Sequence, residues 1–115
     1  MAHDHFQPEL VLSMLEQKKL RSHLEQIDIA AFEANKQVLS KSVGRVDLNS
    51  FRKLATSAAI ARAHWIAAAA TLVDPSRTPT ESEVTHLAKL RAGYIELSEA
   101  YEAMRRMVER GYVVL

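Results

Sequence analysis

Histidine is the residue type in this sequence that is best suited to chemistry near neutral pH, and His64 has the most unusual setting. It lies in the alanine-rich stretch SAAIARAHWIAAAATLVD (57–74), on a helical stripe that is more polar than the stripe carrying Trp65. An imidazole that projects from a helix can accept a phosphoryl group or transfer a proton. The competing interpretation is an ordinary surface or partly buried histidine.

The histidine and the alanines that follow it form a stretch with a sequence resemblance to a family of signalling proteins. The stretch AHWIAAAA resembles the active helix of histidine phosphotransfer domains, which implies a signalling module with His64 as the phosphorylated residue. Those domains carry a lysine and then a glycine shortly after the histidine, where this chain has Ala67 and Ala68. A single long helix after the histidine also differs from their bundle. Phosphotransfer through His64 is therefore our second functional hypothesis.

Glu83 and His86 form a Glu-x-x-His pair, a spacing that puts both side chains on one face of a helix. Di-iron bundles use this motif twice, with two further glutamates on other helices, whereas it occurs once here. The chain has no cysteine, which excludes thiolate zinc sites. A capping-box glutamate beside a surface histidine is the favoured interpretation of this weak candidate pair, so we expect no metal and no cofactor. A helical metal or enzyme site is the third functional hypothesis.

Other function classes have little support in the sequence. No glycine-rich turn exposes a nucleophile near His64, and no glycine loop is available to hold a phosphate. The net charge is +1, and the basic clusters QKKLR (17–21) and MRRMVER (104–110) are expected toward opposite ends of the molecule. We therefore expect a protein that is not an enzyme and does not bind nucleic acid.

The composition is that of a soluble globular domain, with 48% apolar and 25% charged residues. The longest uncharged run in the alanine-rich stretch is 63–73, too short for the roughly 18–20 residues of a membrane span. The first residues lack the basic and apolar regions of a secretory signal. We expect one cytoplasmic domain over 1–115, with a flexible terminus at 1–7 and an apolar tail at 112–115.

Few glycines and prolines occur, and their positions divide the chain into three long helices, at about 8–41, 48–73 and 79–110. Short connections make sequential helices antiparallel neighbours, so the predicted fold is an all-α, up-down-up bundle. Each helix carries a main apolar stripe at alternating steps of three and four residues, and the first helix adds a partial second stripe of Ile29, Phe32, Leu39 and Val43. The three main stripes are Leu20, Leu24, Ile27, Ala31, Ala34 and Val38; Phe51, Leu54, Ala58, Ala61, Trp65, Ala68 and Leu72; and Leu87, Leu90, Tyr94, Leu97, Tyr101, Met104 and Val108.

Capping residues predict where the second and third helices begin. Asp47 can cap the second helix. The third has two overlapping capping boxes, Thr78 with Glu81 and Thr80 with Glu83, so its first residue is open between them. Gly111 is expected to stop it.

The first helix is expected to be longer than its neighbours, and its first turns would overshoot the bundle. One solution is a break near residues 21–23, which would give a fourth helix. The favoured solution is a homodimer in which the overhang packs against a second copy. The interface candidates on this surface are Val11, Leu12, Met14 and Leu15, with Phe32 and Leu39 as secondary candidates.

The function predicted from these patterns is protein–protein contact by a small helical bundle. The alanines of 48–73 would let a neighbouring helix approach closely. A hydrophobic ligand groove is an alternative if the alanine-lined side of that helix leaves a gap beside tyrosines such as Tyr94 and Tyr101.

Overall fold

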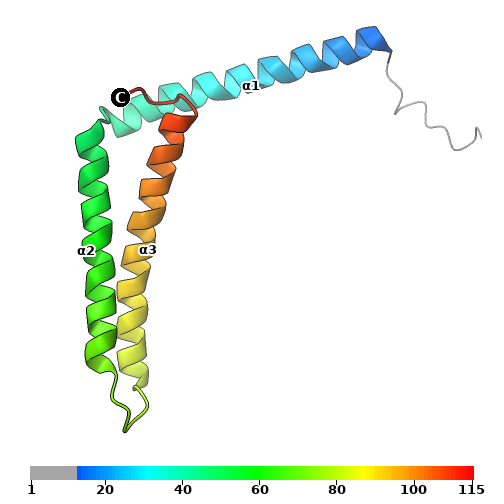
Figure 1. Cartoon of the computed structure of the whole chain (residues 1–115). Helices are drawn as coiled ribbons and strands as arrows, with labels where there is room; N and C mark the ends of the chain where they lie inside the picture. Colours follow the sequence, from blue (N-terminus) through cyan, green and yellow to red (C-terminus); the bar gives the residue numbers. More distant parts are fainter. Residues whose placement is uncertain (1–12) are drawn as a thin grey trace, which may run out of the picture. The chain divides into compact units, whose positions relative to one another are not determined.

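The computed structural model describes residues 13–115, and within this range the regular structure is helical without a strand. Helix α1 spans Met14–Val43, α2 spans Leu48–Leu72 and α3 spans Glu81–Glu109 (Figure 1). The all-α prediction is therefore confirmed. The chain divides into two units, of which the first ends at Val38 and the second spans Leu39–Leu115. None of the helices in the described range is both long enough and apolar enough to cross a membrane.

Helix α1 is continuous through residues 21–23, so the alternative in which a break there creates a fourth helix is wrong. Its start also differs from the expected position near residue 8, because Ser13 is not helical and caps the helix. The Ser13 hydroxyl accepts a hydrogen bond from the Glu16 backbone N–H at 3.1 Å. The Glu16 carboxylate accepts one from the Ser13 N–H at 3.4 Å. This capping box, SMLE in the sequence, was overlooked, and residues 8–12 lie outside the described range.

The end of α1 lies two residues beyond the predicted one, at Val43. Gly44 follows it with a φ of 73°, in the left-handed region that glycine enters without a steric penalty. The glycine therefore determines where the chain leaves α1 and turns toward α2.

The predicted caps of α2 and α3 are present. An Asp47 carboxylate oxygen accepts the Ser50 N–H at 3.0 Å, and the Ser50 hydroxyl accepts the Asp47 N–H at 3.3 Å. At α3 the second of the two alternative boxes forms, so Thr80 is the N-cap and Glu81 is the first helical residue. Both helix starts are thus set by local side-chain bonds to backbone N–H groups that have no partner within the helix.

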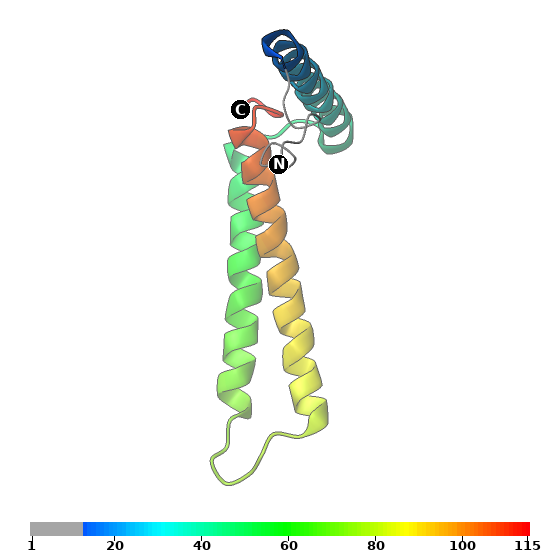
Figure 2. The same cartoon turned by 90° about the vertical axis from the view of Figure 1, so that its right-hand side faces the viewer.

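Helix α3 ends in a Schellman motif around Gly111. This confirms the prediction that this glycine stops the helix. Gly111 has a φ of 76° and donates its N–H to the Val108 carbonyl at 3.0 Å. The Tyr112 N–H reaches back to the Met107 carbonyl at 2.9 Å, which satisfies a second terminal carbonyl. The C-terminal tail then lies at the same end of the α2–α3 pair as the turn at 44–47 (Figure 2).

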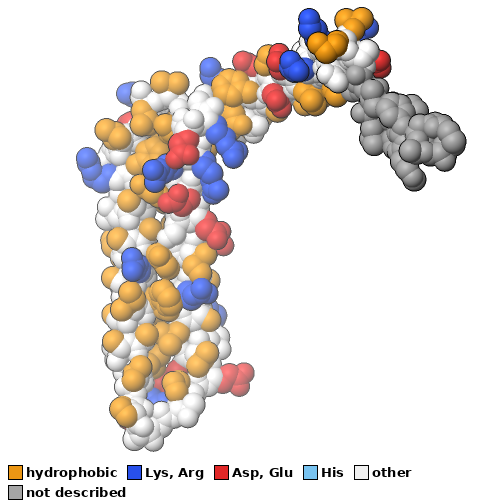
Figure 3. All heavy atoms as spheres, turned by 45° about the vertical axis from the view of Figure 1, so that its right-hand side comes forward, with side chains coloured by type: hydrophobic (Ala, Val, Ile, Leu, Met, Phe, Trp, Pro, Cys, Tyr) orange, Lys and Arg blue, Asp and Glu red, His pale blue; other side chains and the backbone are white. Residues whose placement is uncertain are grey.

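Helices α2 and α3 pack against each other as an antiparallel hairpin (Figures 1 and 2). Every residue of the two predicted stripes is half-buried or buried, so both stripes face the partner helix. Burial is shallow, however, because among the described residues only Val46 (5% exposed) and Ala58 (9%) are buried apolar side chains. Two helices can cover only one side of each other, and apolar side chains remain at the surface along the hairpin (Figure 3).

Candidate functional site

Two aromatic contacts join α2 to α3 and fix which residues of the two helices lie opposite each other. Trp65 and Tyr94 stack with their ring centroids 5.8 Å apart and an interplanar angle of 21°. Phe51 and Tyr101 meet edge to face at 5.9 Å. Such pairs stabilise by about 0.5–1.5 kcal/mol beyond the area they bury. They anchor the hairpin on either side of Ala58, the buried residue of α2.

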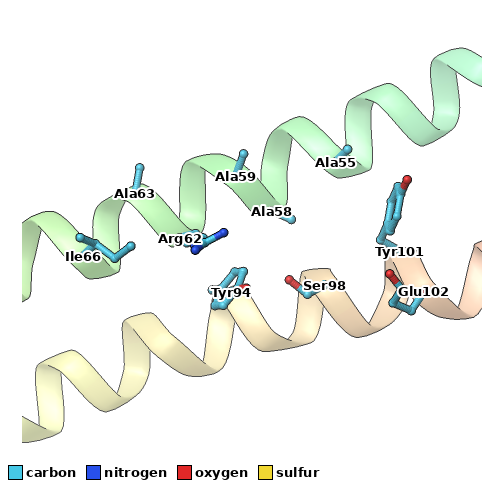
Figure 4. Close-up of a pocket in the computed structure, with 10 residues that line it drawn as sticks. All are labelled: Ala55, Ala58, Ala59, Arg62, Ala63, Ile66, Tyr94, Ser98, Tyr101 and Glu102. Carbon is cyan, nitrogen blue, oxygen red and sulfur yellow. The ribbon is translucent and has the colours of Figure 1, made fainter.

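Between these two anchors a groove of about 680 Å³ runs along one side of the hairpin. Small side chains of α2 line one wall, because alanines recur there at steps of three and four residues. Two tyrosine rings, a serine and a glutamate line the other wall. The lining residues, drawn in Figure 4, are Ala55, Ala58, Ala59, Arg62, Ala63, Ile66, Tyr94, Ser98, Tyr101 and Glu102.

The chemistry of the groove favours binding over catalysis. Most of its lining is aliphatic or aromatic, and its two charged residues, Arg62 and Glu102, come from different helices and lie at different levels of the groove (Figure 4). No ion pair joins either of them to another residue in the range 13–115. A groove with apolar walls and separated charges of opposite sign suits an apolar surface that carries complementary charges.

His64 is exposed on α2 and does not line the groove. Its ring therefore has the accessibility that phosphoryl transfer requires, but the groove does not supply it with neighbouring groups. Phosphotransfer stays a prediction, and the structure places His64 on an open helix surface.

Glu83 and His86 do not form one site, although they are one helical turn apart. The two Glu83 carboxylate oxygens accept hydrogen bonds from the Arg77 guanidinium at 2.7 and 2.9 Å, and one also accepts the Thr80 N–H at 2.8 Å. His86 instead lines a separate polar hollow with Lys89 and other residues of the first turns of α3. No group of three or more metal-binding side chains is found in the described part of the chain.

The environment of Glu83 lowers its pKa to about 2, mainly through the hydrogen bonds from Arg77 and secondly through the Thr80 N–H. Because the pKa of the folded state lies below the ordinary value of 4.5, Glu83 stabilises the fold above about pH 4.5. That stabilisation is lost as the pH falls from there toward 2. Glu83 thus holds the α2–α3 loop through Arg77 and caps the start of α3 through the Thr80 N–H.

We expect Glu83→Gln to reduce the loss of stability that the wild-type protein shows on acidification from about pH 5 to about pH 2. Urea unfolding followed by circular dichroism across this pH range measures the effect. Some acid sensitivity should remain, because hydrogen bonds from Ser50 and Ser76 also lower the pKa values of Asp47 and Asp74.

The control for this prediction is Glu81→Gln, which removes a carboxylate from the same helical turn and keeps the bonds to Arg77 and Thr80. Equal acid sensitivity of Glu83→Gln and wild type would show that the Arg77–Glu83 pair does not stabilise the folded state.

The predicted interface residues fall into three groups. Met14 and Leu15 are strongly exposed on α1, at 77% and 63%. Phe32 and Leu39 are half-buried. The two remaining candidates, Val11 and Leu12, lie outside the described residues.

Sequence reasoning raised the possibility of a groove on the alanine-lined side of α2 but did not identify its polar members, Arg62, Ser98 and Glu102. One signal was available, since Ala55, Ala59 and Ala63 recur at four-residue steps beside the predicted stripe. Arg62 and Glu102 could not be predicted as members of the groove, because a single arginine or glutamate on a helix is common at a solvated surface.

Comparisons with known proteins add no identification to this geometry. No family model, no curated protein and no solved structure matches the chain. The arrangement of its own side chains therefore carries the functional argument.

Proposed function

We propose that this protein acts by protein–protein contact, as a homodimer in which the apolar surface of α1 packs against a second copy. The observation that supports the proposal is that α1, a helix of 30 residues, contains no buried residue. Its stripe of Leu20, Leu24, Ile27, Ala31, Ala34 and Val38, called the α1 stripe below, is exposed throughout.

Such a stripe favours a partner. A single helix cannot bury its own apolar face, and exposed contiguous apolar surface is characteristic of contact sites. Full burial of one leucine or isoleucine contributes about 1.5–3 kcal/mol, so the stripe has enough apolar surface to stabilise a complex. A second copy offers an identical stripe with the same spacing, and two-fold pairing is the commonest assembly of soluble proteins.

The first turn of α1 offers a second, separate apolar surface. Met14 and Leu15 are exposed at the first turn and lie on a different side of the helix from the α1 stripe. We propose that they contact the partner beyond the stripe, with Phe32 and Leu39 as secondary contacts. The mechanism is burial of helical apolar surface, opposed by the entropy cost of association.

The α1 stripe is tested by the paired change Leu24→Glu/Ile27→Glu, which puts two charges into the proposed contact. We expect wild type to have twice the chain mass of 12.9 kDa by size-exclusion chromatography with light scattering, and the variant to be a monomer of unchanged helix content. The reason is that a carboxylate buried against an apolar partner loses its hydration without gaining a counter-charge.

A matched control is Gln26→Glu/Gln37→Glu, which adds the same charge to residues of α1 outside the stripe and should stay dimeric. Two results contradict the proposal. One is a monomeric wild type, and the other is unfolding of the stripe variant, which would make Leu24 and Ile27 part of the core of a single chain.

A further inference from the structure

We propose that the groove between α2 and α3 binds the same groove of a second copy, with the two hairpins antiparallel across a two-fold axis. The inference rests on the self-association in the proposed function: it adds a second surface to the same two-fold dimer and names the residues that set its orientation. The axis passes the middle of the groove, at the level of Ala58, Ala59 and Ser98.

The shape of the groove favours a helical partner. Its α2 wall is built from alanines, which let another helix approach toward the short end of the usual interhelical range of about 8–10 Å. Ile66 is 51% exposed at one end, and the rings of Tyr94 and Tyr101 are only half-buried. A second hairpin would cover these side chains and complete a four-helix arrangement, which a hairpin alone cannot do.

The charges of the groove are separated along its length. Arg62 lies level with Tyr94, whereas Glu102 lies beside Tyr101 at the Ala55 end (Figure 4). Arg91, one turn before Tyr94 on α3, has its guanidinium 5.8 Å from the centroid of the Trp65 ring and does not line the groove.

Glu102 is the charged lining residue near the Ala55 end. Arg105, one turn from Glu102 on α3, pairs with Glu109 at 3.4 Å. Neither Arg62 nor Glu102 has an ion-pair partner within residues 13–115. The groove lining therefore carries one cation and one anion at different levels, and each charge is available to a partner.

This polarity selects the antiparallel orientation. A two-fold axis perpendicular to the helices exchanges the ends of the groove, so Arg62 of each copy comes level with Glu102 of the other copy. The small Ala55 then lies opposite the longer Arg62 side chain. A two-fold axis along the helices would instead bring like charges to the same level, which is unfavourable. Charge complementarity thus identifies a second copy of this chain as the occupant.

Charge reversal tests the pairing in the full chain. Arg62→Glu and Glu102→Arg each place like charges at both ends of the proposed interface, so we expect each variant alone to self-associate about tenfold more weakly or worse. The double variant Arg62→Glu/Glu102→Arg should recover wild-type association, and an equimolar mixture of the two single variants should form a heterodimer. Sedimentation or light scattering measures the masses, and distinct tags on the two variants identify the mixed species.

The mixing step separates the proposal from a folding defect, because restoration between two different chains requires contact between copies. Lys89→Glu and Glu96→Arg are the controls. They reverse exposed charges of α3 outside the groove lining and should leave association unchanged. Single variants that associate like wild type, or a mixture that stays monomeric, would overturn the proposal.

The two proposals fail in different ways. If the α1 stripe variant dissociates the protein while the charge reversals have no effect, the groove inference is wrong and the α1 contact stands. If the charge reversals act and the stripe variant does not, the groove is the interface and the α1 contact is wrong. A wild type that is monomeric at all concentrations overturns both.

Discussion

Trp65→Ala is expected to lower the free energy of unfolding by about 3 kcal/mol, the low end of the range for truncating a large aromatic side chain. The substitution removes the stack on Tyr94 and the contact with the Arg91 guanidinium. It also opens a cavity between α2 and α3. Few other buried side chains hold these helices together, so the lost contacts are not replaced. The value lies at the low end because Trp65 is only half-buried.

Urea unfolding followed by far-ultraviolet circular dichroism measures this loss, with both proteins at the same concentration because self-association stabilises the folded chain. His64→Ala is the matched control. It truncates the neighbouring exposed ring on the same helix and should change stability by no more than about 0.5 kcal/mol. Similar effects of the two substitutions would show that the Trp65–Tyr94 contact does not hold the hairpin together.

Ala58→Leu has the second largest expected effect, a loss of about 1–3 kcal/mol caused by overpacking. Ala58 is the buried residue of α2 and faces α3 between the two aromatic anchors. Three extra carbon atoms at this position push the helices apart and disturb both ring contacts. Near-ultraviolet circular dichroism should report the change through Trp65, and urea unfolding should report the loss of stability.

Ala67→Leu provides the comparison for this substitution, since Ala67 is exposed on the same helix and outside both the stripe and the groove lining. It adds the same atoms without a neighbour to displace, so its stability should stay close to that of wild type. An Ala58→Leu protein as stable as Ala67→Leu would mean that α2 and α3 do not approach as closely as the structure shows.

The sequence was sufficient for those features that depend on residues close together in the chain. The steps of three and four residues predicted which faces of α2 and α3 meet, and each stripe residue from Phe51 to Leu72 is at least half-buried. Asp47 and Gly111 marked helix ends correctly, because caps form within a few residues of the bonds they satisfy.

Local patterns did not predict the first residue of α3, for which two capping boxes were available, or that of α1, for which the capping box SMLE (13–16) was missed. Thr78 and Thr80 offered equivalent caps, and the structure uses Thr80, whose partner Glu83 is also held by Arg77 from the preceding loop. The capping role that the sequence favoured for Glu83 over a pairing with His86 is confirmed by the Thr80–Glu83 capping box, and Arg77 also donates to both of its carboxylate oxygens. No periodic pattern reveals a loop arginine that folds back onto a helix start.

The sequence by itself determined the helical class, the packing faces of α2 and α3 and most helix ends, because hydrophobic periodicity and capping are properties of short segments. Tertiary structure alone decided that Arg77 of the loop folds back onto Glu83, and that a groove with Arg62 and Glu102 at different levels lies beside Ala58. The groove depends on the spacing and relative level of two helices. Aromatic contacts between residues distant in the chain, Trp65 with Tyr94 and Phe51 with Tyr101, set that level.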